Sequence, residues 1–311
     1  MSKKRIAVVA LGGNALVKKG ETISIPHQVR QVTQAMRNII PLLKTYDLVI
    51  THGNGVQVGS ILIRVEEAMG KAYALPLEVC VAESEGEIGY LIEQSLHNVL
   101  LEHKISKPVI GLLTEVIVDK NDPAFKHPTK PIGPWYTKKQ AEQLQRKGFS
   151  MVYEAKRGYR RVVASPLPRK VENTDIIKKL VQNAIVIAVG GGGIPVVKEK
   201  NRMRGVPAVI DKDLASACLA KDIKADLLLI LTGVKKVCLN YGTKKEQPLS
   251  KLTMKQAQFY LKQGHFPEGS MGPKIQAAIN FLRNGGKKVV ITHPSCVSKA
   301  MEGKEGTTIT K

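Results

Sequence analysis

The sequence predicts an α/β fold with an open, mainly parallel central sheet that is sandwiched by helices. Two observations predict it. Six short apolar segments alternate with segments whose apolar residues recur at helical spacing. The short segments are almost continuously apolar, as in parallel strands that are covered on both faces. The 311 residues, 43% of them hydrophobic and 24% charged, suffice for one large domain or two closely joined lobes.

The predicted elements follow one another regularly along the chain. We expect strands where short apolar runs are bounded by glycine or polar residues, at 6–11, 48–51, 109–113, 185–189, 227–231 and 289–292. We expect helices where the apolar spacing is helical, at 27–43, 58–67, 87–101, 175–182, 214–222 and 274–283. Residues 119–161 interrupt this order with four prolines and the only tryptophan, in "DKNDPAFKHPTKPIGPWY". We interpret them as a flap of the N-terminal lobe, with a plain surface insertion as the alternative. The pattern resumes after residue 171, which predicts lobes at 1–171 and 172–311.

Glycine-rich turns follow three of the predicted strands. They read "ALGGNAL", "THGNGVQVG" and "AVGGGGIP". Ligands of open α/β sheets bind beyond the carboxyl ends of the strands, and glycine lets backbone amides approach an anion closely. The chain lacks GxxxxGK[ST], and its glycine spacing does not match GxGxxG, so neither a P-loop nor a dinucleotide fingerprint is supported.

Two lysines occupy positions that oppose a helix dipole. Lys212, between Asp211 and Asp213, starts one predicted helix, and Lys274 follows Pro273, which suits the first position of another. A cation in a first turn costs about 0.3–1 kcal/mol. In one interpretation Lys212 extends into solvent while Asp211 caps the helix. In the other, a phosphate binds at both helix N-termini, and the aspartates hold the lysines or ligate Mg²⁺. Lysines and glycine amides suffice for phosphoryl transfer.

Composition argues against several other functions. The net charge of +22 suits anionic partners, but the lysines are dispersed and only 5% of residues are aromatic, so we do not expect nucleic-acid binding. No CxxC or HExxH occurs, which argues against zinc. No segment approaches the roughly 20 apolar residues that span a bilayer, and the N-terminal apolar run is interrupted by glycines. We expect a cytoplasmic enzyme with reduced cysteines. Ser84 and Ser270 lack an obvious His/Asp partner for nucleophilic catalysis.

Nine motifs in order resemble those of carbamate kinases, within the amino acid kinase superfamily. They are "ALGGNAL", "THGNGVQVG", "GEIGY", "VDKNDPAF", "PTKPIGPWY", "RGYRRVVASPLP", "GGGGIPV", "VIDKDLA" and "GSMGPKIQAAI", and they span nearly the whole chain. The resemblance implies the amino acid kinase fold, a homodimer and a role in arginine metabolism. It implies reversible transfer of a phosphoryl group from carbamoyl phosphate to ADP, which gives ATP and carbamate. The carbamate decays to ammonia and carbon dioxide.

The resemblance also implies roles for individual residues. The implied catalytic residues are Lys130 on the flap, Lys212, Lys274, Asp211 and Asp213. The implied phosphate- and substrate-binding residues are Gly12, Gly13, Asn14, Gly53, Asn54, Gly55 and Ser84. The implied nucleotide-binding residues of the C-terminal lobe are Gly191, Thr232, Val234, Tyr241, Met271 and Gly272. Mg²⁺ would be carried by ADP or ATP, and no protein side chain is assigned to it.

The sequence departs from the family pattern at two places. It reads "ILTGV" where the family usually reads ILTDV, so Gly233 lacks a carboxylate on the nucleotide side. It reads "AESEG" where the family usually reads AMSQG, so Glu83 and Glu85 flank Ser84. A carboxylate close to a bound anion costs about 1 kcal/mol or more. Either both glutamates face solvent or pair with basic residues, or the chain uses another small carboxylate or carbamate-like acceptor. A non-catalytic nucleotide-binding regulator is the third hypothesis.

Overall fold

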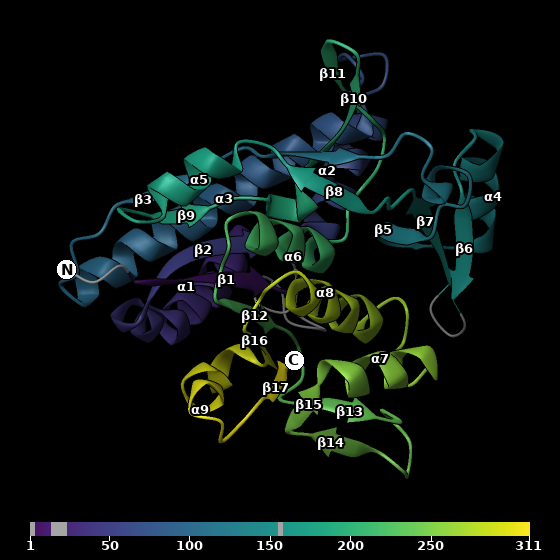
Figure 1. The fold of residues 1–311 in the computed structure, drawn as a ribbon. Coiled ribbons are helices and arrows are strands. Elements are labelled where there is room, and N and C mark those ends of the chain that lie inside the picture. Colours follow the sequence, from purple (N-terminus) through teal and green to yellow (C-terminus); the bar gives the residue numbers. More distant parts are fainter. Residues whose placement is uncertain (1–3, 14–23, 155–157) are drawn as a thin grey trace.

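The computed structural model describes residues 4–13, 24–154 and 158–311, and its core is an eight-stranded sheet (Figure 1). All six predicted strands are confirmed as members of this sheet, and its neighbouring strands are parallel except for the pair β16 and β17. In spatial order the strands are β15 (Lys251–Thr253), β17 (Thr307–Thr310), β16 (Lys288–Thr292), β12 (Leu227–Leu231), β1 (Arg5–Leu11), β2 (Tyr46–His52), β9 (Ile185–Ile187) and β3 (Val109–Gly111).

Helices cover both faces of the central sheet, as the continuous apolar strands predict. Alternate residues of β1 enter two separate cores, because successive side chains of a strand point to opposite faces. Val9 and Leu11 pack with α1 (Ile25–Ile39), α3 (Leu77–Glu102) and α9 (Val297–Met301). Val8 and Ala10 pack with α5 (Thr174–Leu180), α6 (Lys212–Asp222), α7 (Met254–Lys262) and α8 (Met271–Arg283). The predicted sandwich is confirmed.

Three smaller sheets and two further helices complete the described chain. The strands β11 (Arg202–Gly205), β10 (Ile194–Glu199), β4 (Glu115–Val118) and β8 (Pro168–Val171) form one sheet, and β13 (Val237–Leu239) pairs with β14 (Gln247–Leu249). The strands β5 (Lys130–Tyr136), β7 (Gly158–Val163) and β6 (Met151–Glu154) form a third sheet, which carries α4 (Lys138–Arg146). This third sheet extends two residues beyond the predicted flap, because β7 ends at Val163, and it stands away from the central sheet (Figure 1). The remaining helix is α2 (Gly55–Glu67).

Several elements differ from the sequence-based expectation. The helix α3 begins at Leu77, ten residues before the expected start, and α1 ends at Ile39, after which a 3₁₀ turn continues to Lys44. The edge strand β15, its neighbour β17 and the helices α4, α7 and α9 were not expected. The lobe boundary at residue 171 stays a prediction, and β9, from the second proposed lobe, lies between β2 and β3 of the first. Within the described ranges, no helix has both the length and the apolar character needed to cross a membrane.

Candidate active site

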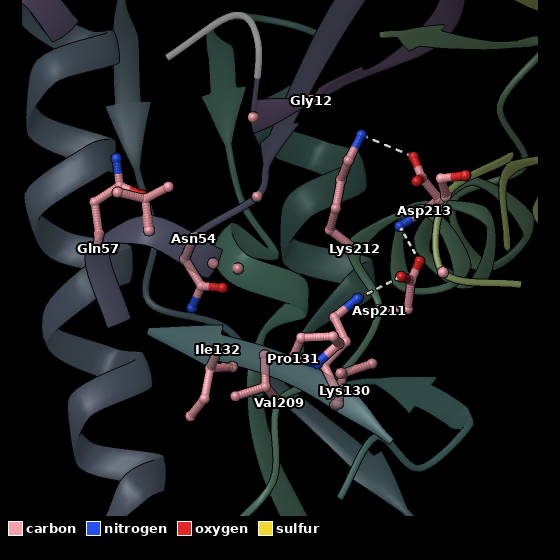
Figure 2. Close-up of a pocket in the computed structure, with 18 of the residues that line it drawn as sticks. Gly12, Asn54, Gln57, Lys130, Pro131, Ile132, Val209, Asp211, Lys212 and Asp213 are labelled. Carbon is pink, nitrogen blue, oxygen red and sulfur yellow. Dashed lines mark hydrogen bonds and ion pairs between the residues drawn. The ribbon is translucent and has the colours of Figure 1, made fainter. Parts of the chain in front are cut away.

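A cavity of about 360 Å³ lies beyond the carboxyl ends of β1, β2 and β12, where the N-terminus of α6 meets the flap strand β5 (Figure 2). This is the place at which an open parallel sheet binds ligands. The cavity brings together predicted residues that are far apart in the sequence. They are Gly12, Gly13, Gly53, Asn54, Gly55, Lys130, Gly191, Asp211, Lys212, Asp213, Thr232 and Lys274.

Asp213 holds two lysines from different helices at this cavity. The Nζ atom of Lys212 lies 2.7 Å from Oδ1 of Asp213, and the Nζ atom of Lys274 lies 3.1 Å from Oδ2. Lys212 also donates to the carbonyl oxygen of Ala10 at 3.3 Å, at the end of β1. The solvent-facing interpretation of Lys212 is therefore wrong. One carboxylate fixes two ammonium groups beside the glycine turns.

Burial shifts the pKa values of this charged cluster. The exposed fractions of Lys212 and Asp213 are 8% and 2%. Burial lowers the pKa of Lys212, whereas the charge of Asp213 counteracts that shift and the charge of Lys274 adds to it. Burial alone would raise the pKa of Asp213, but Lys212 and Lys274 outweigh it and lower that pKa. The three side chains thus carry one excess positive charge at a helix N-terminus, and a bound anion would relieve their repulsion.

A second ion pair joins the flap to the same helix. Asp211 caps α6, because its Oδ1 accepts from the backbone N–H groups of Asp213 at 2.9 Å and Leu214 at 3.4 Å. Its other oxygen, Oδ2, lies 2.6 Å from Nζ of Lys130, the first residue of β5 (Figure 2). Asp211 therefore places a third ammonium group at the cavity. The expectation for Pro273 is wrong, because α8 begins at Met271 and Pro273 is its third residue.

Close packing at Gly191 explains the glycine turn after β9. Gly191 has a φ of +65°, and a Cβ atom there would lie 2.3 Å from Nδ2 of Asn54. That Nδ2 atom donates to Oγ of Ser84 at 2.8 Å. Only glycine leaves Asn54 in this position, since any side chain would both strain the backbone and displace the amide.

A second cavity of about 400 Å³ adjoins the first. Four of the predicted nucleotide-binding residues line it: Thr232, Val234, Tyr241 and Met271. Both cavities share four wall residues, which are Thr232, Gly233, Ser270 and Lys274. A ligand in the second cavity would therefore meet a ligand in the first beside Lys274.

The sequence as a whole matches a known family. A model of the amino acid kinase family matches residues 5–293. The chain belongs to the amino acid kinase family. It is 46% identical to the carbamate kinase-like protein YahI of Escherichia coli, with 99% of each chain covered. It is 45% identical to the carbamate kinase of Pyrococcus horikoshii, with 97% and 98% covered. It superposes on the structure of carbamate kinase from Giardia lamblia bound to AMP-PNP with a TM-score of 0.92 at 40% identity, with all of both chains covered.

Three predicted residues of this amino acid kinase do not lie where the prediction placed them. Ser84 is fully buried behind Asn54 and lines neither cavity. Gly191 lines the first cavity but not the second, so its predicted place among the nucleotide residues is not supported by the geometry. Gly272 is buried in the first turn of α8 and lines neither cavity. Asn14 lies outside the described residues.

The two glutamates beside Ser84 point in different directions. Glu83 is exposed on α3. Glu85 is buried, with an exposed fraction of 3%, and its oxygens accept from the backbone N–H groups of Gly190 at 2.8 Å and Thr114 at 3.2 Å. Neither glutamate lines the cavity. The expectation that both face solvent or pair with basic residues is thus wrong for Glu85, which neutral backbone groups hold.

Gln57 and Arg160 are polar side chains of the cavity wall that were not expected from the sequence. Gln57, in the first turn of α2, donates through Nε2 to Oε1 of Gln28 at 2.6 Å. Arg160, on β7, donates through Nε to the carbonyl oxygen of Gly133 at 3.2 Å, and its guanidinium carbon lies 5.3 Å from the centre of the Trp135 ring. The position of Gln57 inside the glycine-rich motif "GNGVQVG" could have indicated that this side chain lines the cavity. Arg160 reaches the cavity only because β7 pairs with β5, and no pattern in the sequence indicated that pairing.

Proposed function

We propose that this protein is a carbamate kinase that transfers a phosphoryl group reversibly between carbamoyl phosphate and ADP, giving ATP and carbamate. The observation that supports this most is the convergence of Lys130, Lys212 and Lys274 on one cavity that adjoins a second one. The similarity to carbamate kinases over the full chain supports the same acceptor. Carbamate then decays to ammonia and carbon dioxide.

The lysines would act by aligning the phosphoryl group and balancing its charge. A transferring phosphoryl group spreads negative charge over its oxygens and requires no protein nucleophile. Lys212 and Lys274 are held by Asp213, and Lys130 is held by Asp211, so their ammonium groups are positioned before substrate arrives. Preorganised donors of this kind stabilise the transition state without reorganisation. The backbone N–H of Gly13 would add an uncharged donor, whereas those of Gly12 and Gly53 donate to the carbonyl oxygens of Leu231 at 2.9 Å and Leu11 at 3.1 Å.

The second cavity would hold the nucleotide with its phosphates toward Lys274. Among the residues that the structure describes, no three His, Cys, Asp or Glu side chains gather to hold a metal ion, and both aspartates of the first cavity are engaged by lysines. These residues fit a Mg²⁺ ion that arrives on the phosphates of ADP, where it would screen their charge. A homodimer, a cytoplasmic location and a role in arginine metabolism complete the proposal, and they are supported by the family resemblance.

Replacing Tyr241 by alanine tests the nucleotide site. We expect the KM for ADP to rise about fivefold, because loss of an aromatic contact costs about 1 kcal/mol, while kcat stays within about twofold. Steady-state kinetics and titration calorimetry with ADP measure the two effects. The control is Tyr73→Ala, which removes an 86% exposed tyrosine that lines neither cavity. An unchanged affinity for ADP would remove Tyr241 from the nucleotide site.

The direct test of the proposed function is ATP formation by the purified protein from carbamoyl phosphate, ADP and Mg²⁺. Spontaneous breakdown of carbamoyl phosphate is measured without enzyme and subtracted. Turnover that requires both substrates supports a carbamate kinase. A protein that binds ADP but forms no ATP would instead favour another acceptor or the regulatory hypothesis.

A further inference from the structure

Asn54 is the N-cap residue of α2, but its side chain does not cap the helix. An asparagine at this position usually turns its side-chain oxygen back to accept from a backbone N–H of the first helical turn. Asn54 makes no such bond. Its exposed fraction is 3%, and it lines the first cavity. The place of this buried amide is therefore set by something other than helix capping.

Ser84, on α3, sets the orientation of the Asn54 amide. The hydroxyl of Ser84 donates its only hydrogen to the carbonyl oxygen of Val81, at 2.7 Å. Toward Asn54 the hydroxyl oxygen can then only accept, so the amide atom that lies 2.8 Å from it is the donor Nδ2. The opposite orientation would bring two acceptor oxygens together. The hydrogen-bond network thus determines which end of the amide faces α3.

The amide oxygen of Asn54 consequently points away from Ser84. Gly191 closes the nitrogen end further, because a Cβ atom there would lie 2.3 Å from Nδ2. Oδ1 has no hydrogen-bond partner in the part of the chain that the structure describes. Figure 2 shows this oxygen on the side of the amide that faces Lys130, and the nitrogen on the other side. The cavity therefore contains an acceptor that is buried, uncharged and held in one orientation.

A phosphoryl group does not suit this acceptor. Its oxygens are negatively charged acceptors themselves, so they would repel the lone pairs of Oδ1. The lysine pair that Asp213 holds, Lys212 and Lys274, offers the phosphoryl group a better place. A substrate group near Asn54 has to donate a hydrogen bond, because Oδ1 can only accept one.

The carbamoyl group carries such a donor, since its amide-like amino group has two N–H hydrogens. We propose that Oδ1 of Asn54 accepts a hydrogen bond from the amino group of carbamoyl phosphate or carbamate, and that Ser84 holds the amide in position to do so. The inference rests on the proposed function, for which it makes Asn54 a specificity-determining residue and Ser84 a positioning residue. Acetyl phosphate has a methyl group in place of the amino group and would leave Oδ1 without this partner, which is how a polar site rejects an analogue.

The preference between two phosphoryl donors tests the role of Asn54. The quantity measured is the kcat/KM for carbamoyl phosphate divided by that for acetyl phosphate, with ADP and Mg²⁺. We expect Asn54→Leu to lower this ratio by about 10- to 100-fold, because leucine fills a similar volume but has no acceptor. A change that only disturbed the fold or the lysines would lower both values together. An unchanged ratio in the folded Asn54→Leu protein would overturn the proposal.

Ser84→Ala tests the positioning role. Without the hydroxyl, the amide of Asn54 can turn over, and Nδ2 can face the cavity in place of Oδ1. We expect the same ratio to fall about fivefold or more, although Ser84 lines neither cavity. The matched control is Ser95→Ala, because Ser95 is a fully buried serine of the same helix whose Oγ accepts from Oγ1 of Thr33 at 3.2 Å. This variant should keep the ratio, and equal ratios in the two serine variants would refute the positioning role.

Ligand binding separates this inference from the proposed function. Phosphonoacetamide and 2-oxopropylphosphonate differ only in an amino group against a methyl group, and their binding requires no turnover. By titration calorimetry the unaltered protein should bind phosphonoacetamide about tenfold more tightly, and Asn54→Leu should bind both compounds alike. A protein that shows this preference but forms no ATP would refute the proposed function alone. A protein that forms ATP from carbamoyl phosphate but binds both compounds equally would refute the role of Asn54 alone.

Discussion

Lys212→Ala is expected to lower kcat by about 10²- to 10³-fold while the protein remains folded. This is the scale for losing one preorganised donor to a developing charge. The fold should survive because Asp213, although buried, keeps its ion pair with Lys274 at 3.1 Å. Removal of one partner therefore does not leave an isolated buried charge, which is the usual reason for large destabilisation. Single-turnover kinetics and the urea midpoint measure the two quantities.

Lys221→Ala is the control for this prediction. Lys221 lies in the last turn of the same helix and does not line the cavity. Its Nζ atom lies 3.0 Å from Oδ1 of Asp222. The substitution Lys221→Ala removes one positive charge from α6, as Lys212→Ala does, but leaves Lys130, Lys212 and Lys274 in place. We expect kcat to change by less than about twofold. Near-normal turnover in a folded Lys212→Ala protein would show that Lys212 does not contact the phosphoryl group.

Gly191→Ala is expected to lower kcat/KM by about 100-fold. The added Cβ atom would lie 2.3 Å from Nδ2 of Asn54, so the amide has to move by roughly 1 Å. That shift also stretches the 2.8 Å bond from Asn54 to Ser84, which holds the Gly53–Gly55 turn against α3. A misplacement of this size costs about two orders of magnitude when it affects groups that align a reaction.

The control separates this effect from backbone strain. Gly264 has a φ of +76° and nothing within 4 Å of a Cβ atom, so Gly264→Ala imposes the strain alone. Gly264→Ala should lose about 1–2 kcal/mol of unfolding free energy, since an L-residue pays this in the left-handed region, and Gly191→Ala should lose more because its Cβ atom also displaces Asn54. Only Gly191→Ala should lose activity. Equal kinetic losses in the two variants would mean that Asn54 does not need its observed position.

The central sheet could be predicted because its strands are buried on both faces. A strand such as 227–231 is continuously apolar because both of its faces are buried, and this pattern is visible in the sequence. The edge strand β15 and its neighbour β17 could not be predicted in this way, because β15 reads KLT and β17 reads TTIT, so polar residues interrupt the apolar pattern of both strands. Their place is set by tertiary pairing, such as the antiparallel contact of β17 with β16.

The lysine cluster could be predicted for a related reason. Cations at helix N-termini are unfavourable on their own, so Lys212 and Lys274 were visible as exceptions. Their shared partner Asp213 lies 61 residues before Lys274 in the sequence, and only the fold brings the two together.

The two glutamates beside Ser84 show where the sequence was misleading. The departure from the family pattern at "AESEG" indicated that Glu83 and Glu85 are two possible negative charges flanking Ser84, near the expected carbamate site. The helix begins at Leu77, and residues two apart on a helix do not share a face. Glu83 therefore faces solvent while Glu85 turns inward. The glycines Gly86 and Gly89 and the charged residues of this segment weaken the helical pattern that would have revealed it.

The most direct test of carbamate as the acceptor compares two acyl phosphates as phosphoryl donors to ADP. ATP formation is followed with carbamoyl phosphate and with acetyl phosphate, in the presence of Mg²⁺ and after subtraction of spontaneous breakdown. A carbamate kinase is expected to favour carbamoyl phosphate by more than about tenfold in kcat/KM, which is a difference of about 1.4 kcal/mol in transition-state binding. Equal or better use of acetyl phosphate, by a protein that binds ADP, would contradict the proposed acceptor.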